Sequence, residues 1–579
     1  MLRKAQFLKK FFSLAVTKTL LYPSSSLLSH PKGTKSQFLS FSLISSYSFS
    51  SFQSFNNTYK DDLALIQGFS REQLAYAGEI LERYSTSQDL KTFDSDEIHW
   101  ITSLLQHFAT TFQAQGDFNK AYSYIKEAEE VIKKVNIDDT FFVANNHYIK
   151  ASLCLNLNDS TTDVKHHFNE VDRICHLLGD DPEAKSLRVK NLLTRGEFHK
   201  RRNELDQALE FFNEILENTH QVIDAVLPDL LIPAYREIAR IYASNTDIDK
   251  AIHFATKGLA VAIQRYGENS KPAFLFHCDL AEFLYQNQRY QEAEQYINKS
   301  LLIGLQVYPS DHRIIGWCYG LLGHILLANG GFANALEAYK KSIKIYELSP
   351  QEHSLALSEV YYQSAMINNV LDYSQEASLL FDKSAQMLAM SENPDIVEIY
   401  MQRAGELQQH ARLKEYEIYL QGALEACQKF NLQDKTVPAN INFSLGELAF
   451  EKQDWKNALD FFKESEKLFR ECSTDPRSLY VLYSYLGTSY VIAKDYDEGL
   501  RYLQKTIDAC QANGDIGYLQ QVYYYLGKIY HMRGMTEKGE EADEKFRNFY
   551  KNSNKEDPHI QGGIEEAKKV FSVIETLSG

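Results

Sequence analysis

The chain has 579 residues, which is more than one hydrophobic core usually accommodates, so it forms either several domains or an extended array. Only 12 prolines and 27 glycines interrupt it, and long helices therefore meet few breakers. The net charge of −16 has the wrong sign for a reader of long single-stranded nucleic acid, which needs a basic groove to neutralise phosphates, so we expect no nucleic acid partner.

The first sixty residues differ in composition from everything that follows. They contain no Asp or Glu, and they carry one arginine, seven lysines and fourteen serines. Such a stretch is typical of an organelle transit peptide, and residues 1–21 can form a basic amphipathic helix. Lysines interrupt the apolar run of a secretory signal, and no window reaches the about 20 apolar residues of a transmembrane helix. We expect a disordered mitochondrial transit peptide over residues 1–58, with a plastid presequence or a merely disordered tail as alternatives.

A regular pattern of small residues begins at about residue 96, after a segment (residues 59–95) that we expect to form capping helices. A first small residue recurs at intervals close to 42 residues, and a second follows twelve positions later in nine of eleven units. The first small residues are Ala109, Ala151, Gly196, Ala239, Ala281, Gly323, Ala365, Ala404, Gly446, Gly487 and Gly527. The second is replaced by Asp163 in the second unit and by Tyr416 in the eighth. Because two antiparallel helices approach closely only where small side chains face each other, the pattern predicts about eleven helix pairs over residues 96–550.

Aromatic residues accompany the small ones at fixed distances. Three positions before the second small residue, next to turn residues, stand Phe118, Tyr290, Phe332, Trp455 and Tyr496. We expect each of these to begin the second helix of its pair. No pair buries its apolar faces alone, so neighbouring pairs must stack to complete the core. After a linker, residues 564–577 have helical periodicity, and we expect the segment 551–579 to cap the last pair.

The small, aromatic and turn positions resemble those of the tetratricopeptide repeat (TPR) family, whose usual period is 34 residues. The longer period here is similar to that of kinesin light chain repeats, with the best match in residues 266–308. The resemblance implies an all-α fold, a right-handed TPR α-solenoid of helix-turn-helix repeats whose first helices line a concave groove. A kinesin light chain also carries a long N-terminal heptad coiled coil, and this chain shows no sustained heptads.

Signatures of catalysis are missing from the sequence. It contains no P-loop, GxGxxG, HExxH, GxSxG or EF-hand loop, so we expect no enzyme activity, no cofactor and no metal. The seven cysteines are widely spaced without a CxxC pair, and we expect them to be small apolar residues inside helices. The pair His166-His167 has no partner at metal-ligand spacing, and we interpret it as part of a solvated helix face.

Candidate groove residues follow from the family's geometry, in which positions around the first small residue face inward. They are Arg236, Arg240, Glu282, Tyr285, His324, Tyr362, Glu447, Phe450, Tyr524, Lys528 and His531. Arg236 and Arg240 are one turn apart, as in the clamp by which some TPR co-chaperones hold a C-terminal carboxylate, but the Asn positions of that clamp are not matched. The alternative is that these eleven residues are ordinary surface positions.

The presequence and the repeats together predict a non-enzymatic scaffold that binds protein partners in mitochondria, and assembly of a larger complex is one role that fits it. The alternatives are a kinesin-light-chain-like cargo adaptor, and a chaperone-docking import factor or plastid assembly factor. Neither the identity of the partners nor the oligomeric state follows from the sequence.

Overall fold

The computed structural model describes residues 71–86, 90–135, 140–157, 161–179, 181–218, 227–472, 476–513 and 516–552. Within these ranges the chain forms 23 α-helices and one short 3-10 helix (Leu90–Thr92), and it contains no strand, which confirms the all-α fold class. The predicted transit peptide (residues 1–58) and the predicted C-terminal helix (residues 564–577) lie outside the described residues.

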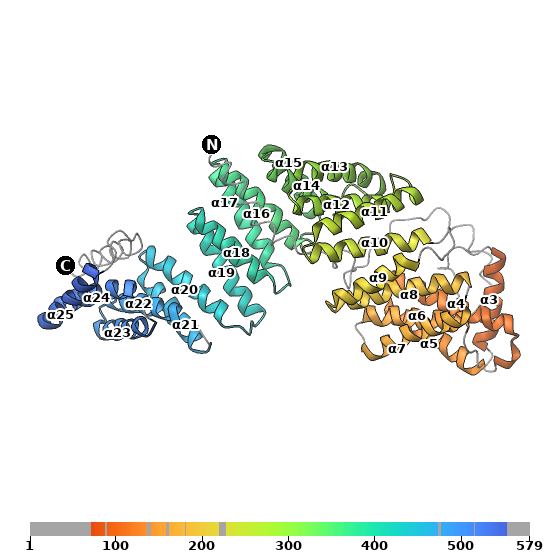
Figure 1. Ribbon diagram of the computed structural model, residues 1–579, viewed down its shortest axis with the longest axis horizontal. Helices are drawn as coiled ribbons and strands as arrows, with labels where there is room; N and C mark the ends of the chain where they lie inside the picture. Colours follow the sequence, from red (N-terminus) through yellow and green to blue (C-terminus); the bar gives the residue numbers. More distant parts are fainter. Residues whose placement is uncertain are drawn as a thin grey trace. The chain divides into compact units, whose positions relative to one another are not determined.

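The chain divides into two compact units, residues 1–338 and residues 339–579, and each is treated by itself. The helices of the first unit are α3 (Arg71–Thr86), α4 (Ser95–Gln115), α5 (Phe118–Val135), α6 (Phe141–Leu157), α7 (Thr161–Leu178), α8 (Pro182–Arg201), α9 (Leu205–Asn218), α10 (Leu227–Ser244), α11 (Ile248–Tyr266), α12 (Lys271–Gln286), α13 (Tyr290–Val307) and α14 (Arg313–Ala328). The boundary between the units falls within α15 (Phe332–Tyr346). Within the described residues, the first unit therefore consists of α3 followed by helix pairs (Figure 1).

The second unit has the same plan. Its helices after α15 are α16 (Ser354–Val370), α17 (Ser374–Ala389), α18 (Ile396–Gln409), α19 (Leu413–Lys429), α20 (Thr436–Glu451), α21 (Trp455–Arg470), α22 (Pro476–Ile492), α23 (Tyr496–Asn513), α24 (Ile516–Met532) and α25 (Thr536–Asn552). From α4 to α13 and from α16 to α25, the helices that follow one another along the chain pack together in pairs, and within each of these two stretches each pair contacts the next. This packing is what the short loops between amphipathic helices require.

The small residues mark the closest approach within the pairs. All eleven first small residues lie on the first helix of a pair, and the nine second ones lie on the helix that follows. Ala109 on α4 and Ala121 on α5 are fully buried. A Cβ added to Gly446 on α20 would lie only 2.5 Å from a ring carbon of Phe462 on α21, so glycine here makes room for an aromatic ring.

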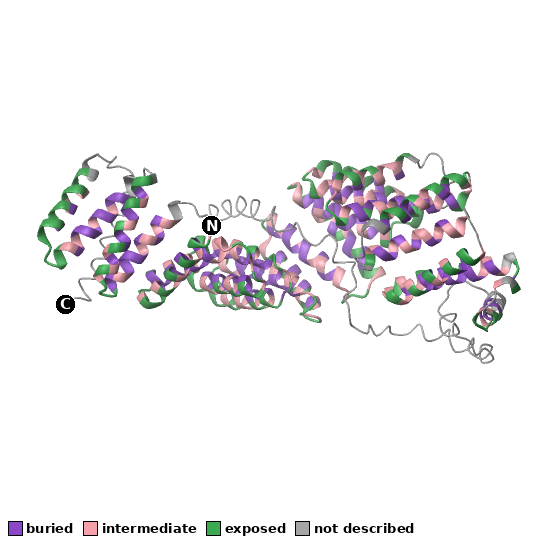
Figure 2. Ribbon diagram, turned by 90° about the horizontal axis from the view of Figure 1, so that it is seen from below, coloured by how far each residue is buried: buried purple, intermediate pink, exposed green. Residues whose placement is uncertain are grey.

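The aromatic residues also occupy their expected places. Phe118, Tyr290, Phe332, Trp455 and Tyr496 are each the first residue of the second helix of their pair. Figure 2 shows buried and exposed residues alternating along many of the helices, as expected for helices with one face in the core and one towards solvent.

A left-handed turn residue recurs in the repeats, which the sequence pattern had not revealed. Seven positions after the first small residue, the backbone has positive φ in ten units: at Gly116, Asn203, Thr246, Gln288, Gly330, Asp372, Ala411, Gln453, Lys494 and Gly534. In the remaining unit this position falls outside the described residues. Such a residue ends a helix and allows the chain to reverse into the next one, which fixes the pairing.

The seven cysteines lie in the helices or directly after them, without disulfide bonds. Six are buried and Cys472 is half-buried, which confirms that they pack as small apolar residues. Among the helices of the described ranges, none is both long and apolar enough to span a bilayer.

Candidate functional site

The predicted groove residues of the first unit lie on three successive first helices, α10, α12 and α14. Arg236 Nε donates to Asp279 Oδ2 at 2.5 Å, and Arg236 Nη2 donates to Oδ1 at 3.2 Å. Arg240 Nη2 donates to the same Oδ1 at 3.1 Å. The side chain of Asp279 is only 3% exposed. The two arginines of α10 are therefore held by a buried carboxylate of α12, which sequence reasoning missed.

The electrostatics of this cluster follow from burial and from the two arginines. Burial by itself raises the pKa of Asp279, but Arg236 and Arg240 outweigh it and hold the pKa below its ordinary value. Glu282, one turn further along α12, has its pKa raised to about 7 by burial and by the charge of Asp279. The cluster thus combines an ion-paired Arg–Asp–Arg group with a second carboxyl whose pKa is raised towards neutrality.

Tyr285 and His324 lie in the packed interior and not on an open groove surface. Both side chains are buried. The ring of Tyr285 lies 5.7 Å from that of Tyr290 and 6.5 Å from that of His324, measured between centroids. These contacts place both residues in the packing between α12, α13 and α14, which corrects their prediction as groove-lining residues.

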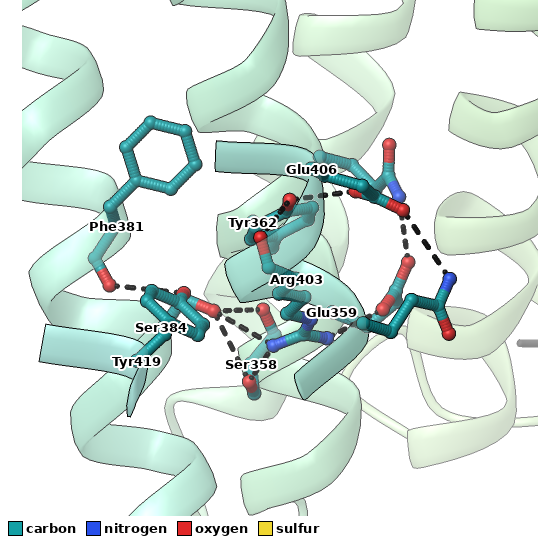
Figure 3. A network of polar contacts seen from close by, with 10 residues as sticks. Ser358, Glu359, Tyr362, Phe381, Ser384, Arg403, Glu406 and Tyr419 are labelled. Carbon is teal, nitrogen blue, oxygen red and sulfur yellow. Dashed lines mark hydrogen bonds and ion pairs between the residues drawn. The ribbon is translucent and has the colours of Figure 1, made fainter. Parts of the chain in front are cut away.

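A second polar cluster lies between α16, α17 and α18 in the other unit (Figure 3). Its centre is Arg403, which is 3% exposed. Arg403 Nη1 donates to Ser358 Oγ at 2.6 Å and to Ser384 Oγ at 3.1 Å, and Nη2 donates to Glu359 Oε2 at 2.6 Å. A buried guanidinium is stable only when such partners replace its hydration, so the network locks three helices together.

Tyr362 belongs to this network and does not lie on an open surface. Its ring is buried beneath the Arg403 guanidinium, whose carbon lies 4.7 Å from the ring centroid. Its hydroxyl donates to Glu406 Oε2 at 2.7 Å. The prediction of Tyr362 as a groove-lining ring is therefore corrected: the residue positions Glu406, which is partly exposed.

The remaining predicted residues lie on α20 and α24. Phe450 is buried between Trp455 and Tyr485, with centroid distances of 5.0 and 5.5 Å, so it too is a core residue. Glu447 is half-buried on the same helix.

On α24, Tyr524 and Lys528 are half-buried, and the Lys528 ammonium lies 5.9 Å from the ring centroid of Tyr524. His531 is exposed, with Nε2 3.0 Å from Asp543 Oδ2. For these partly exposed residues, a role in partner binding stays a prediction.

The interpretation of His166-His167 as a solvated face is wrong for His167. His166 is exposed, but His167 is buried with Nδ1 2.8 Å from Nδ1 of His147 on α6. Burial, followed by the charges of Lys150 and of the neighbouring histidines, lowers the pKa of His167 to about 4. Both pKa values are lowered, so the two rings form a neutral pair in which one of the facing nitrogens donates a hydrogen bond and the other accepts it. Their separation of 20 residues on two helices carried no signal of this contact.

Comparison with known protein families identifies part of the array. Residues 273–347, which run from α12 beyond the end of α15, match the tetratricopeptide repeat model. A clustered mitochondria protein homolog of Candida albicans is 22% identical over 216 residues, which is 37% of this chain and 16% of that protein. A TPR repeat-containing protein of Methanocaldococcus jannaschii is 23% identical over 319 residues, covering 54% of this chain and 48% of that protein. The chain thus spans less than half the length of these curated relatives.

Solved structures show low overall likeness. RapI in its apo form is 13% identical, with a TM-score of 0.45, and the match covers 64% of this chain and 98% of that one. The TPR-like repeats described as those of a kinesin light chain from Podosopora anserina are 17% identical, with a TM-score of 0.31, and cover 36% and 97%. The assignment rests instead on the family match at residues 273–347 and on the helix pairs that repeat on both sides of it. By these two observations residues 273–347 are similar to tetratricopeptide repeats, and they lie within an array of helix pairs of the same plan.

Proposed function

We propose that this TPR protein is a non-enzymatic scaffold in mitochondria, where it holds partner proteins during assembly of a larger complex. TPR arrays are protein-interaction modules, because their stacked helices present extended surfaces to a partner. The observation that carries the mitochondrial part is the basic, serine-rich and acid-free composition of residues 1–60. The matches to clustered mitochondria protein homologs of Candida albicans and Debaryomyces hansenii support it, at 22% and 25% identity.

The arrangement of α10 and α12 does not favour the chaperone-docking alternative. A clamp for a C-terminal carboxylate needs cationic side chains that are open to the ligand. Arg236 and Arg240 instead donate to the buried carboxylate of Asp279, and an incoming carboxylate would have to compete with it. We therefore place partner binding elsewhere on the first helices.

A targeting experiment tests the proposed location. Residues 1–60 are fused to a fluorescent protein and expressed in cells whose mitochondria and plastids are both labelled. We expect the fusion to accumulate in mitochondria, and a matched fusion with Lys9→Glu and Lys10→Glu to lose this targeting, because import depends on the positive face of the segment. A plastid signal, or a diffuse cytosolic signal, contradicts the mitochondrial proposal.

A further inference from the structure

Three hydrogen-bond acceptors gather beside Arg403 in the second unit. They are the carboxylates of Glu359 on α16 and Glu406 on α18, and the side-chain oxygen of Gln363 on α16; we call them the acceptor cluster. Glu359 and Gln363 are one turn apart, and the Gln363 amide Nε2 donates to Glu359 Oε1 at 2.9 Å. Glu359 and Glu406 are close enough for the charge of Glu359 to raise the pKa of Glu406.

Glu406 is the carboxylate of this cluster that forms no ion pair within the described residues, and the charge of Arg403 offsets the effect of burial on its pKa only in part. It accepts from the Tyr362 hydroxyl at 2.7 Å and from Gln402 Nε2 at 3.3 Å. No lysine, arginine or histidine of the described residues lies within ion-pair distance of it, whereas Glu359 is paired with Arg403. Burial raises the pKa of Glu406, as expected for a half-buried carboxylate held only by neutral donors.

Gln363 adds a buried acceptor that also has no partner. The residue is more than nine-tenths buried, and its Oε1 accepts no hydrogen bond within the described part of the chain. Exchanging the amide oxygen and nitrogen would bring an oxygen against the Glu359 carboxylate, so the bond to Glu359 fixes which end is the free acceptor. A buried carbonyl oxygen without a donor is costly, and a ligand that donates to it recovers that cost.

We propose that the acceptor cluster binds a basic side chain, arginine or lysine, presented by a partner protein. Both side chains carry several N–H donors and a positive charge, and they match a cluster that contains a carboxylate without an ion pair and an amide oxygen without a donor. Glu406 is partly exposed, so the partner reaches the cluster from solvent. The net charge of the whole chain, −16, favours approach of a basic segment. This inference rests on the proposed scaffold function and names the chemistry of its partner.

The test is a titration of the full-length protein with two fluorescein-labelled peptides. Each has twelve residues of glycine and serine with three spaced arginines, and in the second peptide citrulline replaces arginine as a neutral isostere. The variants are Glu406→Gln, which removes the charge with little change of shape, and Glu398→Gln as its matched control. Glu398 is exposed two turns earlier on the same helix, so both variants change the net charge equally.

We expect Glu406→Gln to weaken binding of the arginine peptide roughly ten-fold, as the loss of a charge-assisted contact does, and Glu398→Gln to leave it within about two-fold. The citrulline peptide should bind the wild type at least about ten-fold more weakly. Gln363→Met, which keeps the net charge, should weaken arginine binding by a smaller factor. Thermal melts of all variants establish that they are folded.

Equal losses in Glu406→Gln and Glu398→Gln would show only general attraction to an acidic chain and would overturn the proposal. Equal binding of the two peptides would overturn it too. These outcomes are distinct from failure of the proposed function, because the targeting of residues 1–60 does not depend on Glu406. If wild type and Glu406→Gln retain the same partners in pull-downs from mitochondria, the scaffold stands and the acceptor cluster is not its contact.

Discussion

At the scale of single residues, His277 on α12 shows how a buried imidazole ties stability to pH. The side chain is 2% exposed, and neither Nδ1 nor Nε2 has a hydrogen-bond partner in the described residues. Its ring lies against that of Tyr296, 5.6 Å away between centroids. Burial, with a smaller contribution from Lys299, lowers the pKa of His277 to about 4, so the ring is neutral in the folded protein at neutral pH.

Replacing His277 by phenylalanine should therefore reduce the loss of unfolding free energy that occurs as the pH falls below 6.5. An unfolded histidine titrates near pH 6.5, so between pH 6.5 and 4 the unfolded chain binds a proton that the folded chain does not. The neutral ring's contribution is full above pH 6.5 and is lost as the pH falls towards 4, by up to about 3 kcal/mol for the shift of His277. His277→Phe removes this loss and two unsatisfied nitrogens.

The measurement is the urea midpoint of wild type and His277→Phe at pH 7.5 and at pH 4.5. His167 has its pKa lowered in the same direction, so the variant should keep part of the pH dependence. If the urea midpoint fell by the same amount between pH 7.5 and pH 4.5 in wild type and in His277→Phe, the burial of a neutral His277 would be contradicted.

The groove residues show what position in a repeat can and cannot predict. Helical spacing correctly placed Arg236 and Arg240 on one face, because residues four apart share a face. It could not reveal their partner, since Asp279 is 43 and 39 residues away and becomes a neighbour only when the next helix pair stacks. Nor could it separate partly exposed Glu447 from buried Phe450, which belong to one helix turn.

At the scale of helices, most of the fold follows from small residues and turns. The two exceptions in the small-residue pattern still form helix pairs. In the eighth pair, where Tyr416 is large, Gly422 on α19 supplies the close approach: a Cβ there would lie 2.5 Å from the ring of Tyr400 on α18. In this pair the small residue of the second helix therefore lies less than two turns after the expected position, and a search at a fixed spacing of twelve residues could not detect it.

Two glycine-to-alanine changes separate packing from helix propensity. Gly446→Ala on α20 places a methyl group against the buried ring of Phe462 at 2.5 Å, and we expect a net loss of about 1–3 kcal/mol from overpacking. Gly405→Ala on α18 meets no atom within 4 Å, so the better helix propensity of alanine should stabilise by up to about 1 kcal/mol.

Urea unfolding followed by circular dichroism measures both variants. Opposite signs are the expected result, because the two positions differ in the space around the Cβ and not in secondary structure. If both changes stabilised the protein, Phe462 would have moved aside at little cost, and the close approach of α20 and α21 would not be a constraint.

At the scale of the molecule, each unit is held together by contacts between neighbours along the chain. The substantial helix contacts join a helix to the next or to the next but one, as in α16 with α17 and α17 with α19. The free energy of unfolding is then close to a sum of contributions from each helix pair and from each interface between neighbouring pairs. A destabilising substitution should therefore affect only the adjacent pairs. Arg403 is the sharpest place to test this, because its guanidinium bridges three helices.

Arg403→Met should loosen α16 to α19 without affecting the helices of the first unit. The substitution leaves the Glu359 carboxylate and the hydroxyls of Ser358 and Ser384 without their buried donor, which costs about 3 kcal/mol or more. Hydrogen–deuterium exchange with mass spectrometry should show faster exchange in α16–α19 and unchanged exchange in α4–α9. Lys467→Met is the control, because Lys467 forms an exposed ion pair with Glu464 that contributes at most about 1 kcal/mol. Faster exchange throughout both units would mean that the array unfolds as one cooperative body, and would contradict the additive description.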